Sequence, residues 1–418
     1  MENNHINNQN SYKKMSFGEI PNDWDELLLK DMAQVIDGDR SSNYPSGDDI
    51  VKEGKLFLST KNIIDSFFNF NEVRFITEEK FNSIKKGKLK KDDLVITMRG
   101  SIGSVARFSG EQFDTALINA QMSIIRPISV NSDYLWSALN SIIMPRYLKK
   151  ITSGSAQPQL TKKDVEKIPV ILPTLPEQKK IASILSIWDK AIELKEKLIE
   201  QKKEQKKGLM QKLLTGEVRL PGFDGEWESV PVEKLCSLIM GKTPSRNNDD
   251  YWGSGYKWIS IADLKSKYIL QTSEEITEKA LKETKIKAIP KGTVIMSFKL
   301  TIGRVGITGE DMYSNEAIVS LRNKDKKILD DEYLYYYLSS IDVTKFGSIA
   351  AKGVTLNSDS LKEIIIKLPN ISEQVAIREI MSKLDLNIEL LEKELSLLKE
   401  QKNGLMQQLL TGKVRVKV

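Results

Sequence analysis

One helix ending occurs twice in this chain, and this repetition narrows the possible folds more than any other pattern. Residues Lys207–Gly216 read KGLMQKLLTG, and residues Asn403–Gly412 read NGLMQQLLTG. At a single offset of 196, Glu177–Leu220 aligns without a gap with Glu373–Val416, and 25 of the 44 positions are identical. Chance similarity between two helices rich in lysine and glutamate would not extend so far. The chain therefore contains two copies of one unit.

The match between the copies continues upstream in weaker form. IGSV at Ile102–Val105 returns as IGRV at Ile302–Val305, and Gly38 corresponds to Gly241. The offset falls from 203 to 200 to 196 along the unit, which indicates loops of unequal length. Each copy is thus predicted to be a variable globular part followed by a nearly identical long helix.

The second long helix has apolar residues at alternating spacings of four and three, which is the seam of a coiled coil. The seam residues are Ile377, Met381, Leu384, Ile388, Leu391, Leu395, Leu398, Lys402, Leu405 and Leu409. In the first helix the same seam is interrupted by Lys195, Lys202 and Lys206. Because a helix with one apolar stripe is not stable alone, we expect the two to pack together. Antiparallel packing is favoured, since parallel packing would require the second globular part to return the chain along the whole helix.

Four glycines lie at or near the helix ends. Gly216 and Gly412 are predicted to end the helices in the left-handed conformation. Gly208 and Gly404 lie inside the last turns, where each costs about 1 kcal/mol relative to alanine. They are either tolerated defects or places where the backbone of a partner comes close.

The globular parts combine short strands and helices. Asp92–Phe108 and Gly292–Thr308 alternate like paired strands around turns with glycine, and Lys267–Glu283 and Asp331–Ser340 are predicted to contain helices. The expected fold class is α/β (α+β): two duplicated domains, each with a mixed or antiparallel sheet, separated by a long antiparallel two-helix coiled-coil spacer. The predicted segments are a disordered leader 1–16, a first domain 17–173, a first helix 174–220, a second domain 221–369 and a second helix 370–418.

Two scarcities exclude whole enzyme classes. The single histidine, His5, lies in the polar leader, and the single cysteine is Cys236. No Ser-His-Asp triad and no thiolate zinc cluster can therefore form within the folded part. In CSLIMGKT, Cys236 occupies the first glycine position of a phosphate-binding loop, and the chain lacks the Pro-Pro of amino-methyltransferase loops. We therefore expect no catalytic residues, metal or cofactor in this chain. Without a membrane-spanning run or signal peptide, a cytoplasmic location is expected.

Polar and basic residues gather in loops of the globular parts, and the net charge of +6 permits nucleic-acid binding. Such residues suit phosphate contacts and base-edge contacts. The candidate DNA-binding residues of the first copy are Arg40, Ser41, Ser42, Tyr44, Lys61, Asn62, Arg99, Ser101, Asn119, Gln121, Gln157 and Gln159. Those of the second copy are Lys242, Thr243, Ser245, Arg246, Lys257, Trp258, Lys265, Lys299, Thr301 and Arg304. On composition alone, ordinary solvated loops and amide-capped turns are commoner. Trp24 and Trp227 are predicted to pack in the core.

The helix motifs LPEQKKIASIL and GLMQKLLTG, followed by LPGFDGEWE, are similar to the specificity subunit of type I restriction-modification systems. In the second copy, GKTPS followed by YWGSGYKWISIADL resembles the opening of that family's target recognition domain. The first copy has DGDRSSNYPS in its place. The resemblance covers residues 17–418.

The resemblance implies a non-catalytic subunit that recognises double-stranded DNA, in which each domain reads half of a bipartite, asymmetric sequence. The helices would set the gap between the half-sites and dock two methyltransferase subunits, and helicase-nuclease restriction subunits would join them. S-adenosylmethionine, ATP and magnesium would belong to these partners. The candidate docking residues are Gly208, Met210, Gln211, Leu214, Gly404, Met406, Gln407 and Leu410.

Two other functions remain open from the residues. A coiled-coil scaffold without a nucleic-acid role would explain the helices but not the basic, amide-rich loops. A stand-alone nuclease or methyltransferase would need a catalytic set, and the sequence offers none beyond chance acidic and lysine triplets.

Overall fold

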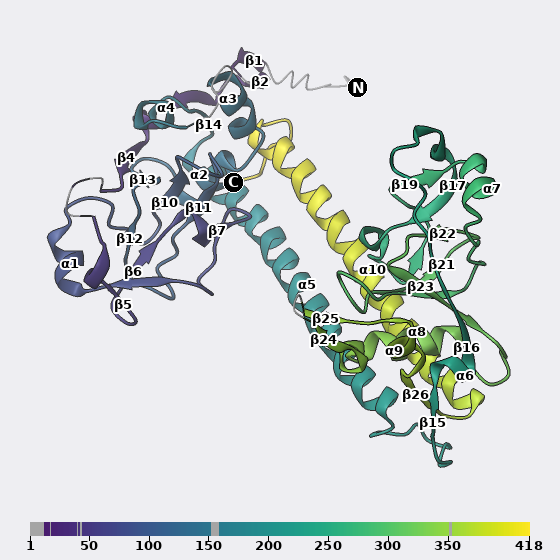
Figure 1. The fold of residues 1–418 in the computed structure, drawn as a ribbon. Coiled ribbons are helices and arrows are strands. Elements are labelled where there is room, and N and C mark those ends of the chain that lie inside the picture. Colours follow the sequence, from purple (N-terminus) through teal and green to yellow (C-terminus); the bar gives the residue numbers. More distant parts are fainter. Residues whose placement is uncertain (1–11, 17, 40, 42–43, 152–158, 351–352) are drawn as a thin grey trace, which may run out of the picture. The chain divides into compact units, whose positions relative to one another are not determined.

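The computed structural model describes residues 12–16, 18–39, 41, 44–151, 159–350 and 353–418, with residues 348–350 and 353–355 described by their backbone alone. The chain divides into two compact units. Unit 1 is Met1–Glu196 with Glu394–Val418, and unit 2 is Lys197–Lys393. Each unit contains one globular part and a portion of each long helix (Figure 1).

Unit 1 consists mainly of short strands. They are β1 (Tyr12–Met15), β2 (Gly18–Pro21), β3 (Asp25–Leu28), β4 (Ala33–Asp37), β5 (Ile50–Val51), β6 (Lys55–Leu58), β7 (Ile63–Ile64), β8 (Phe67–Phe68), β9 (Arg74–Ile76), β10 (Leu94–Thr97), β11 (Val105–Arg107), β12 (Ala116–Ile118), β13 (Met122–Pro127) and β14 (Pro169–Leu172). The helices of its globular part are η1 (Leu29–Asp31), η2 (Gly47–Asp49), η3 (Thr60–Asn62), α1 (Glu78–Ser83), α2 (Ser132–Leu139), α3 (Ile143–Ile151) and α4 (Lys162–Glu166).

Unit 2 repeats this mixture. Its strands are β15 (Glu228–Pro231), β16 (Cys236–Met240), β17 (Trp252–Ile259), β18 (Tyr268–Ile269), β19 (Glu274–Ile276), β20 (Val294–Ser297), β21 (Val305–Thr308), β22 (Tyr313–Ser314), β23 (Ile318–Asn323), β24 (Ser348–Ala350), β25 (Gly353–Thr355) and β26 (Ile365–Leu368). Its helices are α6 (Val232–Leu235), η4 (Asp249–Tyr251), η5 (Ile261–Asp263), α7 (Glu278–Thr284), α8 (Asp331–Ser340), η6 (Val343–Phe346) and α9 (Ser358–Lys362).

Each unit has a central sheet with the same strand order. In unit 1 the antiparallel order is β11-β10-β13-β4, and in unit 2 the corresponding order β21-β20-β23-β16 is extended by β18, which pairs parallel to β21. A second sheet in each unit mixes parallel and antiparallel pairs, since β12 is parallel to β6 and β22 is parallel to β17. The predicted mixed sheets and the strand pairs β10–β11 and β20–β21 are therefore confirmed.

The two long helices are α5 (Leu175–Thr215) and α10 (Ile371–Leu410). The first begins after Thr174, whose amide and hydroxyl both donate to the Glu177 carboxylate, at 3.3 and 3.0 Å. The second begins after Asn370, whose side-chain oxygen accepts the amide of Glu373 at 2.9 Å. These hydrogen bonds satisfy polar groups that the first turn of a helix leaves without a partner.

Both helices end at the predicted glycines. Gly216 has a φ of 76° and Gly412 a φ of 70°, so each adopts the left-handed conformation that glycine reaches without a steric penalty. The amide of Val218 then donates to Lys212 O, and the amide of Val414 donates to Gln408 O. These bonds back into the last turn close each helix.

Ion pairs show that the helices run in opposite directions in unit 1. Lys195 of α5 pairs with Glu394 of α10 at 2.8 Å. Asp189, which lies earlier in α5, pairs with Lys402, which lies later in α10. A step back along α5 therefore corresponds to a step forward along α10, and the two helix segments of unit 1 are antiparallel.

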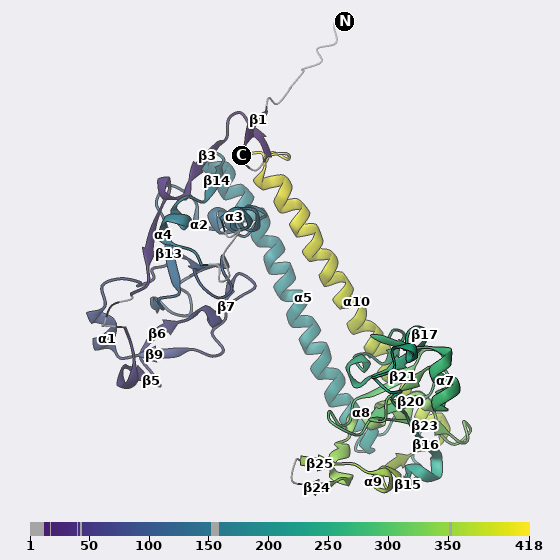
Figure 2. The ribbon, with the colours of Figure 1, turned by 45° about the horizontal axis from the view of Figure 1, so that its top comes forward.

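Unit 2 shows the same antiparallel arrangement. Lys203 pairs with Glu392 at 2.7 Å, and Lys206, which lies later in α5, pairs with Asp385, which lies earlier in α10. The predicted antiparallel packing is therefore confirmed within each unit, where α5 and α10 lie side by side (Figures 1 and 2).

Two ion pairs between the helices are present in both units. The pair Lys206–Asp385 of unit 2 corresponds to the pair Lys402–Asp189 of unit 1. The offset of 196 converts the pair Lys203–Glu392 of unit 2 into Lys399–Glu196, which unit 1 forms at 2.6 Å. The duplication thus extends to individual contacts between the helices.

The predicted seam residues face the helix partner. All ten of them in α10 are buried or half-buried, and so are the residues of α5 at the corresponding positions, 196 residues earlier, including the three lysines. Lys195 and Lys206 reach acidic residues of the other helix with their ammonium groups. Their stems can therefore cover apolar surface while their charges stay paired.

A buried carboxylate joins each globular part to the helix ends. In unit 1, Trp24 Nε1 donates to Glu177 at 3.1 Å and Arg415 Nε donates to the same carboxylate at 2.9 Å. Glu177 is 2 % exposed. The C-terminal tail that carries Arg415 is thereby fixed to the first globular part.

Unit 2 forms the same cluster with its own residues. Trp227 Nε1 donates to Glu373 at 3.1 Å, and Arg219 Nε donates to it at 2.7 Å. Glu373 is 1 % exposed. The prediction that Trp24 packs in the core is confirmed, and Trp227 is half-buried against the core of unit 2.

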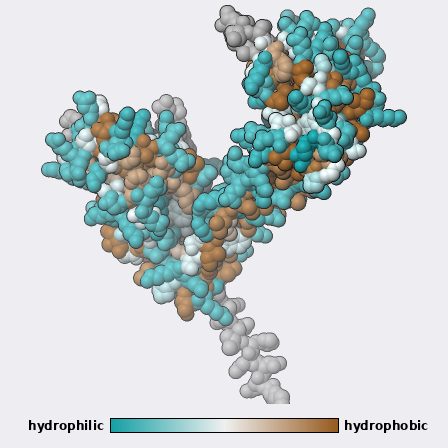
Figure 3. Space-filling model, turned by 90° about the horizontal axis from the view of Figure 1, so that it is seen from below, coloured by the Kyte–Doolittle hydropathy of each residue, from teal (hydrophilic) through white to brown (hydrophobic). Residues whose placement is uncertain are grey.

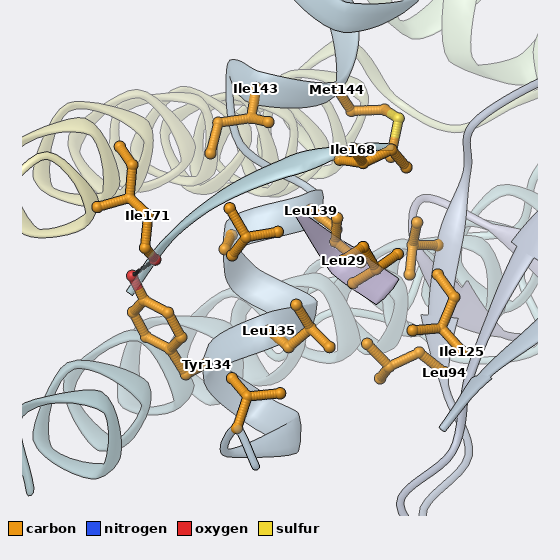
Figure 4. Packing of buried hydrophobic residues seen from close by; sticks show 14 of the residues in the cluster. Leu29, Leu94, Ile125, Tyr134, Leu135, Leu139, Ile143, Met144, Ile168 and Ile171 are labelled. Atoms are coloured by element: carbon orange, nitrogen blue, oxygen red, sulfur yellow. Dashed lines mark hydrogen bonds between the residues drawn. The ribbon is translucent and has the colours of Figure 1, made fainter. Parts of the chain in front are cut away.

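Each unit has its own main core between its central sheet, its helices and the long helix pair. In unit 1 the core includes Leu94, Ile125 and Leu135, and Figure 4 shows these side chains converging. The Tyr134 hydroxyl donates to Ile171 O at 2.7 Å inside this core (Figure 4). In unit 2 the equivalent hydroxyl, from Tyr333, donates to Lys367 O at 2.6 Å.

The N-terminal segment differs in part from expectation. The predicted disordered leader covered residues 1–16, but Tyr12–Met15 forms β1, which pairs antiparallel with β2. The Tyr12 hydroxyl also donates to Gly412 O at 3.3 Å. Contacts with the distant C-terminal helix end order these residues, and a local composition argument cannot detect such contacts. Residues 1–11 lie outside the described part of the chain.

The single cysteine offers a probe of unit 2. Cys236 is buried in β16, and burial raises the pKa of its thiol to about 12. A thiol reagent should therefore react only when unit 2 opens. Glu373→Ala leaves the Trp227 and Arg219 donors without their acceptor, which costs about 1–3 kcal/mol. We expect it to increase the labelling rate of Cys236 by roughly fivefold to a hundredfold.

The matched control is Glu177→Ala, which removes the corresponding carboxylate from unit 1. It should lower the stability of unit 1 and leave the labelling rate of Cys236 close to that of the parent protein. Equal acceleration by the two variants would contradict the division into two units.

Candidate nucleic-acid interface

Three loops meet at one end of the central sheet in each unit. We call them the hairpin tip (residues 98–104 and 298–304), the asparagine turn (119–121 and 315–317) and the glycine loop (38–44 and 241–246). Residues 40, 42 and 43 of the first glycine loop lie outside the described residues. Together the three loops form what we call the three-loop surface of each unit.

A hydroxyl fixes the hairpin tip of unit 1. Thr97 Oγ1 donates to Ser101 O and accepts the amide of Ser104 at 3.0 Å. The amide of Gly103 donates to Thr97 O at 2.9 Å. Hydrogen bonds between residue 97 and backbone groups of the tip therefore fix its shape. The side chains of Arg99 and Ser101 take no part in these bonds and are exposed.

The same hydrogen bonds recur in unit 2. Ser297 Oγ donates to Thr301 O and accepts the amide of Arg304 at 3.0 Å. The amide of Gly303 donates to Ser297 O at 2.9 Å. The side chains of Lys299, Thr301 and Arg304 are exposed.

The asparagine turn links the other two loops. In unit 1, Gln121 N donates to Asn119 Oδ1 at 3.0 Å, and Gln121 O accepts the amide of Met98 at 2.8 Å. A Cβ atom on Gly38 would lie 2.3 Å from Asn119 O, so only glycine fits at this point of the glycine loop. Asn119 is buried and acts as a turn residue, while the side chain of Gln121 is exposed.

Unit 2 builds this junction in the same way. Ala317 N donates to Asn315 Oδ1 at 3.1 Å, and Ala317 O accepts the amide of Phe298 at 2.9 Å. A Cβ atom on Gly241 would lie 2.2 Å from Asn315 O. The correspondence of Gly38 with Gly241 therefore has a physical cause, which is the close approach of the asparagine turn.

Groups from the glycine loop and the hairpin tip of unit 2 act on Glu316, which lies in the asparagine turn. The hydroxyl of Thr243 donates to its carboxylate, and this hydrogen bond lowers the pKa of Glu316 below its ordinary value. The charges of Lys299 and Arg246 lower that pKa further. The carboxylate is consequently ionised near neutral pH and lies among cations.

Several predicted DNA-binding residues of unit 2 already have protein partners. Arg246 pairs with Glu274, and its guanidinium carbon lies 3.7 Å from the ring centre of Trp252. Lys257 donates to Leu270 O at 2.6 Å and pairs with Glu310.

The opening of the glycine loop in unit 2 is also tied to its surroundings. Lys242 Nζ donates to Thr284 O at 2.8 Å, and Ser245 O accepts the indole N–H of Trp252 at 3.1 Å. A DNA contact by the side chain of Lys242 or of Arg246 would therefore compete with contacts inside the unit.

Three predicted residues are buried, which corrects their assignment as free DNA contacts: Asn62, Trp258 and Asn119, the turn residue described above. Trp258 is buried and its Nε1 donates to Lys242 O. Asn62 is buried, and its amide caps the turn at Ser59 and donates to two backbone carbonyls. Sequence spacing alone did not show that these side chains point inward. Tyr44 differs from these: it is half-buried with its ring against Phe57, burial raises the pKa of its hydroxyl, and its DNA contact stays a prediction.

The remaining candidates are exposed or lie outside the described residues. Gln159 adjoins the hairpin tip of unit 1, because the next amide, that of Leu160, donates to Met98 O at 2.9 Å. Beyond the hairpin tips, the asparagine turns and the unit 2 residues discussed above, the exposed candidates are Ser41, Lys61, Gln159 and Lys265. Those outside the described residues are Arg40, Ser42 and Gln157.

The predicted docking residues divide into two groups. A Cβ atom on Gly208 or Gly404 would meet no atom within 4 Å, and the side chains of Gln211 and Gln407 are exposed. Met210 is half-buried at the edge of the core of unit 2.

Three other predicted docking residues are buried in their own units. Leu214, Met406 and Leu410 pack in the main cores, where they stabilise the attachment of each helix end to a globular part. Their assignment as partner contacts is corrected here, because burial within the chain leaves these side chains no surface for a partner.

Two features of unit 2 were not predicted. Leu300 lies at the hairpin tip and is 92 % exposed. A cavity of about 1160 Å³ lies between the globular part and the helix pair, where Lys206, Lys265, Arg304 and Arg378 are among its lining residues. The sequence did contain a signal for the exposed leucine: Leu300 aligns with the turn residue Gly100 of the first copy.

Other site types are not indicated. Within the described ranges, no group of three or more His, Cys, Asp or Glu side chains is arranged to hold a metal ion. None of the helices that the structure describes is long and apolar enough to cross a membrane. Figure 3 shows hydrophilic side chains over much of the face that it presents, with apolar patches between them.

Comparison with known proteins gives a consistent result. The family described as "Type I restriction modification DNA specificity domain" matches residues 21–203 and 224–400. A putative type I restriction enzyme MjaX specificity subunit of Methanocaldococcus jannaschii is 26 % identical over 432 residues, which cover 98 % of this chain and 98 % of the relative. The EcoR124I/EcoR124II specificity subunit of Escherichia coli is 26 % identical over 53 % of this chain and 56 % of its own length.

Solved structures share the fold. One solved chain comes from a study of the structural basis of complex assembly and conformational transition of the type I R-M system. It has a TM-score of 0.63 at 17 % identity, over 94 % of this chain and 99 % of that one. The S subunit of the type I restriction-modification system from M. genitalium has a TM-score of 0.56 at 13 % identity, over 92 % and 96 %. The family match covers both copies of the repeat. The chain therefore belongs to the family of type I restriction-modification specificity subunits, with one DNA specificity domain in each copy.

Proposed function

We propose that this chain selects the DNA target of a type I restriction-modification complex. Each unit reads one half of a bipartite target through its three-loop surface, and α5 and α10 hold two methyltransferase subunits and set the gap between the half-sites. The chain has no catalytic role of its own; methylation and cleavage belong to the partner subunits, which also carry the cofactors. It would act on DNA in the cytoplasm of its host.

The observation that carries this proposal is a repeated frame with different side chains around it. The frame residues are matched between the units: Gly38 with Gly241, Thr97 with Ser297, Gly103 with Gly303, and Asn119 with Asn315. Other positions on the same loops differ: Arg99 and Lys299, Ser101 and Thr301, Ser104 and Arg304, and Gln121 and Ala317. A common frame with different contacts suits two different half-sites, and hence an asymmetric target.

The helix ends support the docking part of the proposal. Gly208 and Gly404 have open space beside them, and neither is required by packing inside the chain. Each begins the same tetrapeptide, GLMQ, near the end of its helix. Two equal surfaces of this kind suit two copies of one partner. A scaffold without a nucleic-acid role has no support from the family to which the chain belongs.

A single exposed amide tests the assignment of half-sites. Gln121→Ala gives unit 1 the residue that unit 2 has at the same position, Ala317. A bidentate amide–adenine contact contributes about 1–3 kcal/mol of discrimination between bases. We expect the variant complex to lose preference at one position of one half-site and to keep the other half-site unchanged. A map of methylated adenines in cells that express the chain with its methyltransferase measures this directly.

Competition binding at one fixed salt concentration provides the second measurement, because phosphate contacts weaken steeply with salt. Arg99→Ala serves as a comparison within the same unit, on the hairpin tip. If the parent complex retains DNA without regard to sequence, the proposed function is wrong. If Gln121→Ala changes both half-sites equally, the assignment of one half-site to each unit is wrong.

Substitution of the two open glycines tests the docking of partners. Gly208→Arg and Gly404→Arg each place a long cation where a partner backbone would lie. Native mass spectrometry should show two methyltransferase subunits on the parent chain, one on either single variant and none on the double variant. Gly208→Ala and Gly404→Ala are the controls: they should retain both partners and stabilise each helix by roughly 1 kcal/mol. If the double arginine variant still binds two methyltransferase subunits, the partners dock at another surface and this part of the proposal is wrong.

A further inference from the structure

Leu300 has the most exposed large apolar side chain that the structure describes. It is 92 % exposed at the hairpin tip of unit 2, while the next such residues, Val418 and Ile128, are 75 % and 74 % exposed. Single exposed apolar residues are common on protein surfaces, so exposure alone does not indicate a function. The backbone at this position supplies a second observation.

Leu300 has a φ of 62°, in the left-handed region. At the corresponding position of unit 1 the chain has Gly100, with a φ of 79°. The turn therefore requires a positive φ in both units, and glycine adopts it without a steric penalty. A leucine at this point strains the backbone, and its exposed side chain gains no burial inside the chain in exchange.

The tip presents this side chain on a fixed support. The hydroxyl of Ser297 holds both Thr301 and Arg304 through backbone groups. Phe298, at the base of the tip, is buried, and its amide donates to Ala317 O. The leucine therefore stands on a loop anchored to the core and to the asparagine turn.

A cation adjoins the leucine. Lys299 precedes it directly and its side chain is exposed, while Arg304, four residues further on, is exposed but donates to Ile261 O at 3.4 Å. An apolar tip beside a cation suits a polyanion with an apolar interior, which is the chemistry of stacked bases between two phosphate backbones. A protein surface would have to offer acidic groups around an apolar pocket.

We propose that Leu300 is an apolar wedge that enters a groove of the DNA half-site bound by unit 2 and presses against its stacked bases. This inference rests on the proposed function, because it takes the three-loop surface of unit 2 as a DNA-binding surface. Unit 1, with Gly100 at the same position, has no wedge there. The two half-sites are therefore deformed differently, and only the half-site of unit 2 is partly unstacked.

The test uses the complex of the full chain with its methyltransferase and DNA that carries 2-aminopurine at successive positions of the half-site read by unit 2. Unstacking increases the fluorescence of this base. The parent complex should show the increase at one base step. Leu300→Gly and Leu300→Ala should both lose it and bind the target roughly tenfold more weakly. Ile128→Ala, which removes another highly exposed side chain, should behave like the parent.

Thermal unfolding separates this effect from a structural one. Leu300→Gly relieves the strained backbone, so its Tm should not fall below that of the parent, while its DNA binding weakens. A parent complex that binds DNA without sequence preference would overturn the proposed function itself. Sequence-specific binding with unchanged fluorescence and affinity in Leu300→Gly would overturn only the wedge. Loss of methyltransferase from Leu300→Gly would assign Leu300 to a protein contact and would also overturn it.

Discussion

A buried carboxylate at the start of each long helix holds each unit together. Glu177 and Glu373 are almost fully buried, and each accepts a tryptophan indole N–H and an arginine guanidinium. A buried charge is stable only when it is paired and hydrogen-bonded, so each carboxylate fixes the elements that supply its partners. In unit 1 those partners are the first residues of the globular part and the last residues of the chain. The C-terminal tail is consequently part of the first unit.

The same unit is used twice with different residues on its loops. The hydroxyls of Thr97 and Ser297 and the close approaches at Gly38 and Gly241 build the same three loops in both units. These frame residues are buried or half-buried, while most loop residues that differ between the copies are exposed. Recognition can therefore change between the two copies without any change in the core. This separation of frame from surface is the physical basis of our proposal that each unit reads its own half-site.

The long helices were easier to predict than the individual site residues. The spacing of apolar residues from Ile377 to Leu409 requires an apolar partner, and the repeat supplied one, so antiparallel packing followed from connectivity. The direction of single side chains did not follow in the same way. Asn62 and Trp258 were predicted to bind DNA, and Leu214 was predicted to contact a partner subunit. Tertiary contacts bury all three side chains. Leu300 was overlooked because its neighbours in the sequence suggested only an ordinary turn.

The order of residues along the chain was enough to establish the duplication and the long amphipathic helix closed by glycine in each copy, and residue counts left a single histidine and a single cysteine. These conclusions depend on periodicity, repeats and residue counts, which are local or additive properties. Folding in three dimensions settles which loops meet, which carboxylates are buried and which side chains remain exposed. Those properties arise from contacts between residues far apart in the chain, such as Glu177 with Arg415, and no local pattern encodes them.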